Sequence, residues 1–344
     1  MSLSRIGSML VMGGIALAAI STGKARAQSE GQPNSLPNPY HLVEGWAKLP
    51  EGRTWGSASA INVDSKGHTW IAERCGKNSC ADSKLDPILE YDASGKLLKS
   101  FGGGMFVLPH AIKFDKAGNF WFTDYGLKDG KGNVAVKFSP EGKILMTLGK
   151  AGVAGDGPDV FSEVDAVVEG KNGDLFVADG HTVGKGNARI MKFTKDGKFI
   201  KQWGEHGSGP GQFEIPHDLV IDSRGRLMVS DRANRRIQIF DQDGKFLEEW
   251  KTFGTPSGLF IDRHDMLYVS DSWSQSKDPN ADRYNPGFDH GIRVGSAKDG
   301  KVTAYLPMPP VAMPNAPEGV TADAQGNLYV ADTIHAGLWK YEKK

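Results

Sequence analysis

Short stretches in which apolar and polar residues alternate recur along the chain, separated by turns rich in Gly, Asp and Asn. One copy runs from Pro109-His110 through a turn containing Asp115 and Gly118 to an apolar stretch that ends at Asp124. Alternation with a period of two, interrupted by such turns, predicts short β-strands. The same frame returns six times at a spacing of roughly 40 to 60 residues. The equivalent positions are Ser59, His110, Asp165, His217, Ser257 and Glu318.

Each repeat contains four predicted strands, as one blade of a β-propeller does. The sixth repeat ends after its third strand, Gly337 to Tyr341, and the segment from Tyr40 to Leu49 supplies the missing outer strand. This closure leaves no free sheet edge. The sequence therefore predicts an all-β fold over residues 40–344, a single six-bladed β-propeller whose repeats resemble the NHL type and whose ring is closed by an N-terminal strand in the last blade.

The first residues have the pattern of an export signal. Arg5 precedes an apolar run from Ile6 to Ile20, and Ala25-Arg26-Ala27 forms a cleavage pattern. We interpret residues 1–27 as a secretory signal peptide and residues 28–39, rich in Pro, Ser and Asn, as a flexible lead-in. A membrane anchor is the alternative, but the run is shorter than the ~20 residues that a span needs. We expect a periplasmic or secreted protein without a membrane span after cleavage.

Composition narrows the possible partners. The 41 Lys and Arg residues balance the 41 Asp and Glu residues, so no charge excess favours nucleic acid. Two cysteines are too few for a four-cysteine zinc site. In an oxidising compartment Cys75 and Cys80 are expected to form a local disulfide, with two buried thiols as the alternative. We expect a monomer.

The insertions all fall between the second and third strands of a blade. They run from Cys75 to Pro87, Gly126 to Asn133, Thr182 to Asn187 and Trp273 to His290. Because strands alternate in direction, these loops share one face with the beginning of each inner strand. Functional residues concentrate on loops carried by a rigid scaffold, so this face is the expected working face.

The six equivalent positions should form a ring at one height in the central channel. His110, His217 and Glu318 come from alternate blades and should converge. Two imidazoles and a carboxylate make a metal site with open positions, and Asp165 could ligate the ion or support a ligand. This ligand set also suits Fe²⁺ or Mn²⁺, so the residues alone leave the identity of the metal open. The alternative is a hydrated polar channel without a metal.

Three further side chains should face the same mouth. Arg74 and Arg232 follow the second strands of their blades, and His181 follows another. Arginines beside a metal suit a substrate that carries a carboxylate, although Arg232 could instead form a structural ion pair. Tyr125 could line the mouth or only pack. Acids recur at the end of every second strand and are expected to hold backbone amides: Glu73, Asp124, Asp179, Asp231, Asp271 and Asp332.

These residues resemble the peptidyl-α-hydroxyglycine α-amidating lyase family, a group of secreted six-bladed propellers. The resemblance covers most of the chain after the signal. It is densest over Asp179-Gly180-His181, Trp203-Gly204-Glu205, Pro210-Gly211-Gln212-Phe213, Pro216-His217-Asp218 and Asp231-Arg232-Ala233-Asn234-Arg235-Arg236-Ile237. It implies zinc held by His110 and His217, and it implies that Arg74 and Arg232 are catalytic.

The chain departs from the family pattern at three positions. Glu318 stands where the family has a third histidine, and His181 stands where it has a catalytic tyrosine. The resemblance also implies a channel calcium on the carbonyls of Ala58 and Ile112, but Gly319 replaces its aspartate ligand. We therefore do not expect Ca²⁺.

The family reaction cleaves the N–C bond of a carbinolamide, releasing an amide and glyoxylate. The resemblance thus implies a metal-dependent lyase in which the metal acts as a Lewis acid, His181 is the base, and Arg74 and Arg232 hold a carboxylate. The substrate would be a small hydroxylated compound, peptide-like or not. Two other functions stay open: another metal-dependent propeller enzyme, such as a lactonase-like hydrolase, and a non-catalytic exported binding protein that uses the loop from Trp273 to His290.

Overall fold

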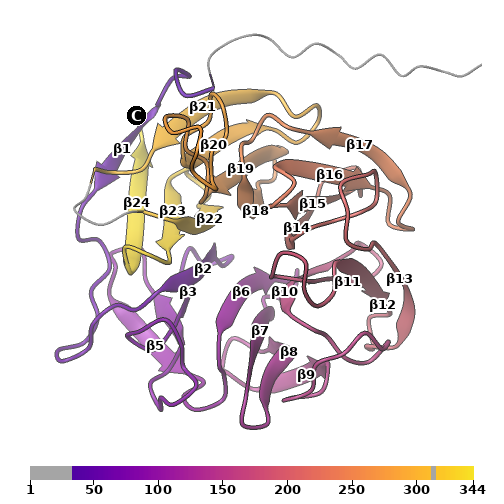
Figure 1. The fold of residues 1–344 in the computed structure, drawn as a ribbon. Coiled ribbons are helices and arrows are strands. Elements are labelled where there is room, and N and C mark those ends of the chain that lie inside the picture. The colour runs from indigo at the N-terminus through magenta and orange to yellow at the C-terminus, as the bar shows by residue number, and fades with distance from the viewer. Residues whose placement is uncertain (1–32, 311–314) are drawn as a thin grey trace, which may run out of the picture. The chain divides into compact units, whose positions relative to one another are not determined.

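The computed structural model describes residues 33–310 and 315–344. The predicted signal peptide over residues 1–27 and the first part of the lead-in lie outside the described residues. Every regular element within the described ranges is a β-strand, and the strands form six four-stranded antiparallel sheets arranged around a centre (Figure 1). None of the described residues forms a helix long and apolar enough to cross a membrane.

Each of the first five blades takes four consecutive strands, from the innermost to the outermost. Blade 1 contains β2 (Ala58–Val63), β3 (Thr69–Glu73), β4 (Ile88–Tyr91) and β5 (Leu97–Phe101). Blade 2 contains β6 (Pro109–Phe114), β7 (Phe120–Lys128), β8 (Lys131–Phe138) and β9 (Ile144–Leu148). Blade 3 contains β10 (Val164–Glu169), β11 (Leu175–Asp179), β12 (Arg189–Phe193) and β13 (Phe199–Trp203). Blade 4 contains β14 (Pro216–Ile221), β15 (Leu227–Asp231), β16 (Arg236–Phe240) and β17 (Phe246–Trp250). Blade 5 contains β18 (Pro256–Ile261), β19 (Met266–Asp271), β20 (Gly291–Ser296) and β21 (Val302–Pro307).

Blade 6 confirms the predicted closure of the ring. Its strands are β22 (Pro317–Ala322), β23 (Leu328–Asp332), β24 (Gly337–Lys343) and, outermost, β1 (Tyr40–Val43). β1 pairs with β24 in the register Tyr40↔Lys343 and Val43↔Lys340. Strands from opposite ends of the chain therefore share one sheet. β1 pairs with the edge of β24 that the sixth repeat would otherwise leave open.

The recurring acids fix the backbone at the beginning of the inner strand of each blade. Asp124, for example, accepts hydrogen bonds from the backbone N–H groups of Val107, Leu108 and Gly126. The acids at the equivalent positions are likewise buried and accept backbone N–H groups. A buried carboxylate needs such donors, so the expected structural role of these residues is confirmed.

Five blades use the same local device in the turn between the first and second strands, and in blade 3 Gly170 takes the place of the aspartate. Asp115 accepts the backbone N–H groups of Ala117 and Asn119, and Gly118 adopts a left-handed φ of 84°. In blade 5 Asp265 takes the glycine position at φ 60°, and its carboxylate accepts the N–H and hydroxyl of Ser223. The neighbouring blade thus offsets the cost of a left-handed non-glycine residue.

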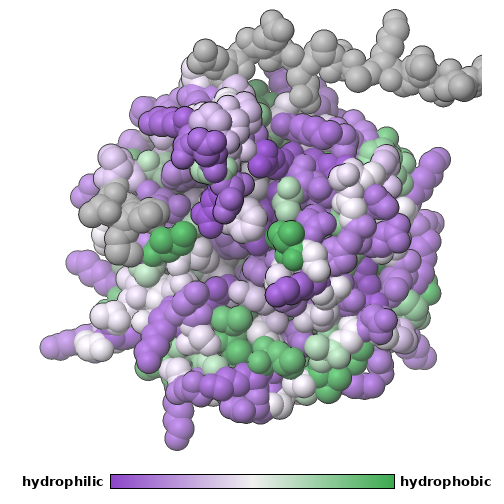
Figure 2. All heavy atoms as spheres, in the orientation of Figure 1, coloured by the Kyte–Doolittle hydropathy of each residue, from purple (hydrophilic) through white to green (hydrophobic). Residues whose placement is uncertain are grey.

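The core lies between the blades and not in the channel. Trp70 of blade 1 packs on Phe120 of blade 2, with ring centroids 5.0 Å apart. Similar apolar clusters fill the other seams between blades. Figure 2 shows mostly hydrophilic side chains on the face seen in Figure 1, with hydrophobic ones in small groups. The six ring positions in the channel are polar: Ser59, His110, Asp165, His217, Ser257 and Glu318.

One expected insertion is not a loop. The segment from Gly126 to Asn133 continues β7 and β8 as a paired hairpin, with Leu127 opposite Gly132 and Lys128 opposite Lys131. Gly126 and Gly132 pack backbone on backbone there, which allows the strands to extend beyond the sheet edge. The loop between β19 and β20 is a true insertion. Its base contacts the lead-in, where Asn34 hydrogen-bonds to Asp289 and Arg293.

Candidate metal centre and channel mouth

The innermost strand of every blade contains a β-bulge at the ring position, which changes the direction of the side chain there. The register of each inner strand with its neighbour shifts between Ala58/Ala60, Pro109/Ile112, Val164/Ala166, Pro216/Asp218, Pro256/Leu259 and Pro317/Gly319. The ring residues Ser59, His110, Asp165, His217, Ser257 and Glu318 lie inside these shifts. A bulge redirects a side chain away from the regular alternation of a strand, so the ring residues can share the channel.

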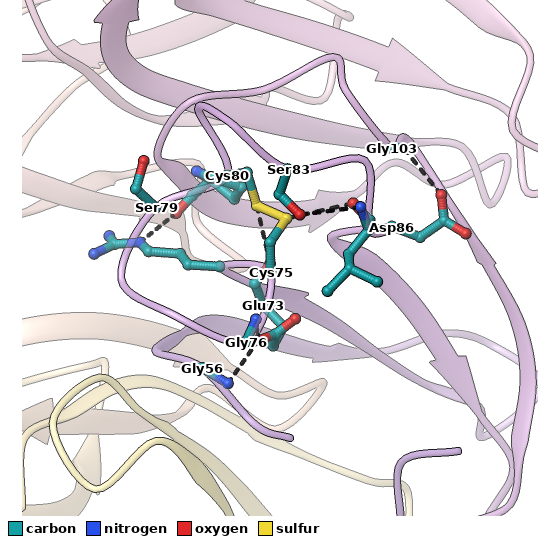
Figure 3. The surroundings of a disulfide bond; sticks show 12 residues. Gly56, Glu73, Cys75, Gly76, Ser79, Cys80, Ser83, Asp86 and Gly103 are labelled. Atoms are coloured by element: carbon teal, nitrogen blue, oxygen red, sulfur yellow. Dashed lines mark hydrogen bonds between the residues drawn. A yellow bond between two sulfur atoms is a disulfide. The ribbon is translucent and has the colours of Figure 1, made fainter. Parts of the chain in front are cut away.

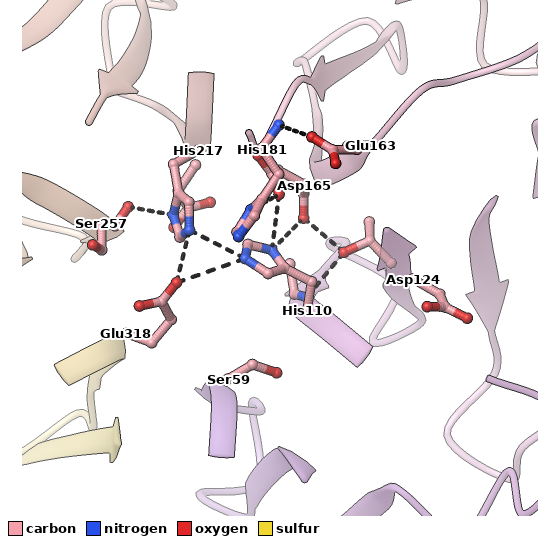
Figure 4. Close-up of polar contacts among 12 residues, drawn as sticks. Ser59, His110, Asp124, Glu163, Asp165, His181, His217, Ser257 and Glu318 are labelled. Carbon is pink, nitrogen blue, oxygen red and sulfur yellow. Dashed lines mark hydrogen bonds and ion pairs between the residues drawn. The ribbon is translucent and has the colours of Figure 1, made fainter. Parts of the chain in front are cut away.

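His110 and His217 face each other across this channel (Figure 4). Their Nε2 atoms are 3.2 Å apart. The Nδ1 atom of His110 lies 2.9 Å from the carbonyl oxygen of Asp165, and that of His217 lies 3.3 Å from the carbonyl oxygen of Ser257. A carbonyl only accepts, so both Nδ1 atoms carry the proton. The lone pairs of both Nε2 atoms therefore point toward one another.

Glu318 brings a carboxylate to the same point. Its Oε1 lies 2.7 Å from His217 Nε2 and 3.8 Å from His110 Nε2. Burial and the Arg232 guanidinium lower the pKa of His217 to about 3. Burial alone would raise the pKa of Glu318, but His217 and Arg232 hold it well below its usual range. The His217 imidazole is thus neutral and the Glu318 carboxylate charged, which is the protonation state that a metal requires of these two ligands.

Asp165 joins this group from the other side. Its Oδ1 lies 2.7 Å from Nδ1 of His181, while its Oδ2 is buried and has no hydrogen-bond partner among the described residues. The ligand atoms of His110, Asp165, His181 and His217 all lie within 4.8 Å of one another. Burial raises the pKa of Asp165 well above its ordinary value and lowers the pKa of His181 well below. The His181 imidazole is therefore neutral.

Tyr125 lies in the mouth, so the structure decides a point that the sequence left open. Its ring stacks on His181 with centroids 4.1 Å apart and meets His110 edge-on at 5.3 Å. Burial raises the pKa of the Tyr125 hydroxyl. His181 stands where the family has a catalytic tyrosine, and Tyr125 of the neighbouring blade 2 lies directly beside it.

Arg74 reaches the mouth from blade 1. Its Nε donates to the carbonyl of Pro109 at 3.1 Å, and its guanidinium lies 5.5 Å from the centre of the Tyr125 ring. A second nitrogen donates to Asn78 at 2.8 Å. Asn78 belongs to the loop between Cys75 and Cys80. These two cysteines form a disulfide (Figure 3), so the expected bridge is confirmed.

Arg232 lies at the centre of the site and is buried. One guanidinium nitrogen, Nη1, donates to His217 Nε2 at 2.8 Å and to Glu318 Oε1 at 3.0 Å. Its guanidinium carbon lies 4.3 Å from the centre of the Trp273 ring, at the beginning of the long blade-5 loop. Its Nε has no partner among the described residues. The sequence did not indicate the Trp273 contact, because the two residues are far apart in the chain and meet only through the loop.

The donor set fits one divalent metal. The Nε2 atoms of His110 and His217 and the Glu318 Oε1 converge, and a bound cation would replace the Arg232 N–H that bridges two of them. The Asp165 carboxyl group, whose Oδ2 has no partner among the described residues, lies beside them. A cavity of about 30 Å³ is lined by His110, His217 and Glu318. His181, two residues after the β11 acid Asp179, lies at this mouth as expected from the sequence; its contact with Asp165 was not predicted.

The residues do not fit a channel calcium. A side chain at Gly319 would meet backbone atoms of Ala60 and Ile61 at 2.9 and 3.0 Å, so an aspartate cannot be accommodated. The carbonyl of Ile112 accepts a hydrogen bond from Asn62. The channel also holds the Lys113 ammonium, which donates to Asp218 and to the Leu259 carbonyl, each at 2.8 Å.

Sequence comparisons find relatives with named activities. Residues 162–280 match the DUF5128 family model, described as a 6-bladed beta-propeller. Peptidyl-glycine alpha-amidating monooxygenase A of Xenopus laevis is 41% identical over 199 residues, which is 52% of this chain and 20% of that protein. Peptidyl-alpha-hydroxyglycine alpha-amidating lyase 2 of Drosophila melanogaster is 29% identical over 58% of this chain and 50% of the fly protein. Human NHL repeat-containing protein 3 is 33% identical over 56% of this chain and 54% of the human one. The match thus spans from a fifth to about half the length of these relatives.

Solved structures share the fold at low sequence identity. A virginiamycin B lyase from Staphylococcus aureus has a TM-score of 0.54 and 19% identity over 89% of both chains. A gluconolactonase from Xanthomonas campestris has a TM-score of 0.59 and 12% identity over 93% of this chain and 99% of the other. The chain is a six-bladed β-propeller whose sequence relatives include peptidyl-α-hydroxyglycine α-amidating lyases and NHL repeat-containing proteins.

Proposed function

We propose that the protein is an exported, metal-dependent lyase that acts at the channel mouth on a small hydroxylated substrate with a carboxylate. The observation that carries this proposal is the convergence of His110 Nε2, His217 Nε2 and Glu318 Oε1, with both imidazole tautomers fixed by backbone carbonyls. The similarity to amidating lyases supports the reaction type.

His110, His217 and Glu318 would hold the ion, with Zn²⁺ first and Fe²⁺ or Mn²⁺ as alternatives. When bound, the metal supplies Lewis acidity to an oxygen of the substrate. Glu318 in place of a neutral histidine lowers the positive charge of such a centre by one unit. Asp165 lies close enough to contribute a further ligand atom.

The protein side chains divide the remaining work. His181 accepts the proton of the substrate hydroxyl. Asp165 orients the His181 ring, because its Oδ1 lies 2.7 Å from His181 Nδ1. Arg74 and Arg232 bind the carboxylate, since guanidinium groups match its two oxygens. In an α-hydroxyglycine compound the C–N bond then breaks, the C–O bond becomes a carbonyl, and the hydroxyl proton passes to the leaving amide nitrogen. The products are a primary amide and glyoxylate.

The direct test is release of glyoxylate from a synthetic N-acyl-α-hydroxyglycine by the zinc-loaded protein. We expect turnover in the wild type and losses of about 10²-fold or more for His181→Ala, the general base. His217→Ala should lose the metal and the activity together. His41→Ala is the matched control, because that histidine is exposed on β1. Turnover that survives His217→Ala would overturn the proposal.

One observation favours a second candidate function. Arg232 donates to His217 and forms an ion pair with Glu318, so its guanidinium can stand where a metal would bind between these two residues. A binding propeller without a metal would use the channel in this way. Inactive wild-type protein that holds no metal after reconstitution would support this function over the lyase.

A further inference from the structure

Two buried hydroxyl groups brace the bulges that carry the candidate histidine ligands. Thr123 of β7 and Ser230 of β15 each directly precede the acid at the end of a second strand, and both are fully buried. Each hydroxyl joins the inner strand of its own blade to the inner strand of the next blade. Neither residue belongs to the set of residues that the sequence analysis selected.

The Thr123 hydroxyl acts on both sides of His110. Its Oγ1 accepts the backbone N–H of Ala111, the residue after His110, at 2.9 Å. It donates to the carbonyl oxygen of Asp165 at 2.6 Å. That same carbonyl receives Nδ1–H of His110. One hydroxyl therefore fixes the backbone of the ligand and the acceptor that sets its tautomer.

Ser230 repeats this arrangement at His217, 107 residues further along the chain than His110. Its Oγ accepts the backbone N–H of Asp218, the residue after His217, at 2.7 Å. It donates to the carbonyl oxygen of Ser257 at 2.9 Å, which is the acceptor for Nδ1–H of His217. In blade 5 Ser270 likewise joins the N–H of Gly258 to the carbonyl of Glu318.

The propeller fold itself does not require these hydroxyls. Blades 1, 3 and 6 have Ala72, Ala178 and Ala331 at the same position, and their inner strands carry similar bulges. The hydroxyls occur in the two blades whose ring residue is a histidine and in the blade that precedes Glu318. Their placement follows the candidate ligands and not the repeat.

We infer that Thr123 and Ser230 are positioning residues for a metal held by His110 and His217. This inference rests on the metal centre in the proposed function. A hydroxyl that holds the accepting carbonyl keeps each Nδ1–H bond in place and thereby aims Nε2 at the ion. Loss of such an outer hydrogen bond typically weakens metal affinity by about 10- to 100-fold.

The experiment measures zinc affinity by competition with a chelator, using the full mature protein. Thr123→Val removes the hydroxyl at constant shape, and Ser230→Ala removes it with little change in volume. Thr123→Ser and Ser230→Thr retain the hydroxyl and should keep wild-type affinity. Thr321→Val is the matched control, because Thr321 is a fully buried threonine whose hydroxyl contacts Asn62, away from both histidines.

We expect the dissociation constant for zinc to rise by about 10- to 100-fold in Thr123→Val and in Ser230→Ala, and to change little in Thr321→Val. Unfolding of the metal-free variants separates general destabilisation from the metal effect. If wild type binds zinc and all three variants bind it equally well, the positioning role is wrong and the metal centre stands. If wild type binds none of zinc, iron and manganese, the metal centre and this inference fail together.

Discussion

Arg232 and Glu318 form a buried ion pair at the centre of the channel, with Nη1 and Oε1 3.0 Å apart. The same nitrogen donates to His217 Nε2 at 2.8 Å. The guanidinium therefore competes with a metal for two of its three proposed ligands. It also places a fixed positive charge where a substrate carboxylate would bind.

Arg232→Gln should accordingly change two affinities in opposite directions. Two unit charges 4 Å apart interact by about 4 kcal/mol at an effective dielectric constant of 20. Removing the guanidinium should therefore tighten zinc binding by about tenfold or more, and it should raise KM for a carboxylate substrate. Zinc competition and steady-state kinetics measure both effects. Arg224→Gln, at a half-exposed arginine of the same blade, is the control; weaker zinc binding in Arg232→Gln would contradict this account.

Trp273 should set the orientation of Arg232. Stacking on an aromatic face leaves the in-plane N–H donors of a guanidinium free for a carboxylate. A desolvated cation–π contact contributes about 2 kcal/mol, so Trp273→Leu should raise KM by about 10- to 30-fold, and Trp273→Phe should fall between it and wild type.

Trp250→Leu is the matched control for this prediction, because Trp250 also contacts an arginine, Arg226, outside the channel. Zinc content should stay constant in all three variants. Equal KM values for Trp273→Leu and Trp250→Leu would show that the contact at Trp273 does not serve the substrate.

Lys113 should be a main contributor to stability across the channel. Its ammonium joins blade 2 to Asp218 of blade 4 and to the Leu259 carbonyl of blade 5. Removing one partner of a largely buried pair costs about 3 to 5 kcal/mol. Lys113→Met should lower the free energy of unfolding by about 3 kcal/mol, and Lys113→Met/Asp218→Asn should recover part of the loss. Lys99→Met, at the more exposed Lys99–Glu90 pair, should cost less than 1 kcal/mol.

Acid should remove one identifiable contribution to stability. Burial alone would raise the pKa of Asp115, but hydrogen bonds from Lys137 and Asn119 outweigh it and lower the pKa. A carboxyl with a depressed folded pKa stabilises the fold above its unfolded pKa, and this contribution is lost as pH falls through the folded pKa. Asp115→Asn should therefore destabilise the protein at pH 7, and the difference from wild type should shrink below about pH 4.

Urea unfolding from pH 7 to pH 3 measures that difference, with Asp196→Asn in an exposed turn as the control. A difference between wild type and Asp115→Asn that stays constant over this range would show that Asp115 acts through the shape of the turn and not through its charge.

The repeat pattern was sufficient for the fold. Turn residues such as Asp115 and Gly118 define the strands locally, and a truncated sixth repeat leaves one outer strand for Tyr40–Val43 to complete. The equivalent ring positions were also predictable, because repeated blades place equivalent residues at one height. The structural role of the recurring acids, such as Asp124, was predictable for the same reason.

The contacts between blades were not predictable in this way. The bulges that aim His110 and His217 follow from small register shifts, which composition does not encode. The contact of His181 with Asp165 and that of Trp273 with Arg232 depend on loop paths that the repeat pattern does not describe. Thr123 and Ser230 look like ordinary strand residues until their hydrogen bonds across the seam are known.

Metal content of the purified mature protein decides whether the channel holds an ion, with the His110→Ala/His217→Ala variant measured beside it. The account predicts about one zinc, iron or manganese ion per chain in the wild type after reconstitution, and none in the variant. Wild-type protein without bound metal, or equal metal in both proteins, would contradict it.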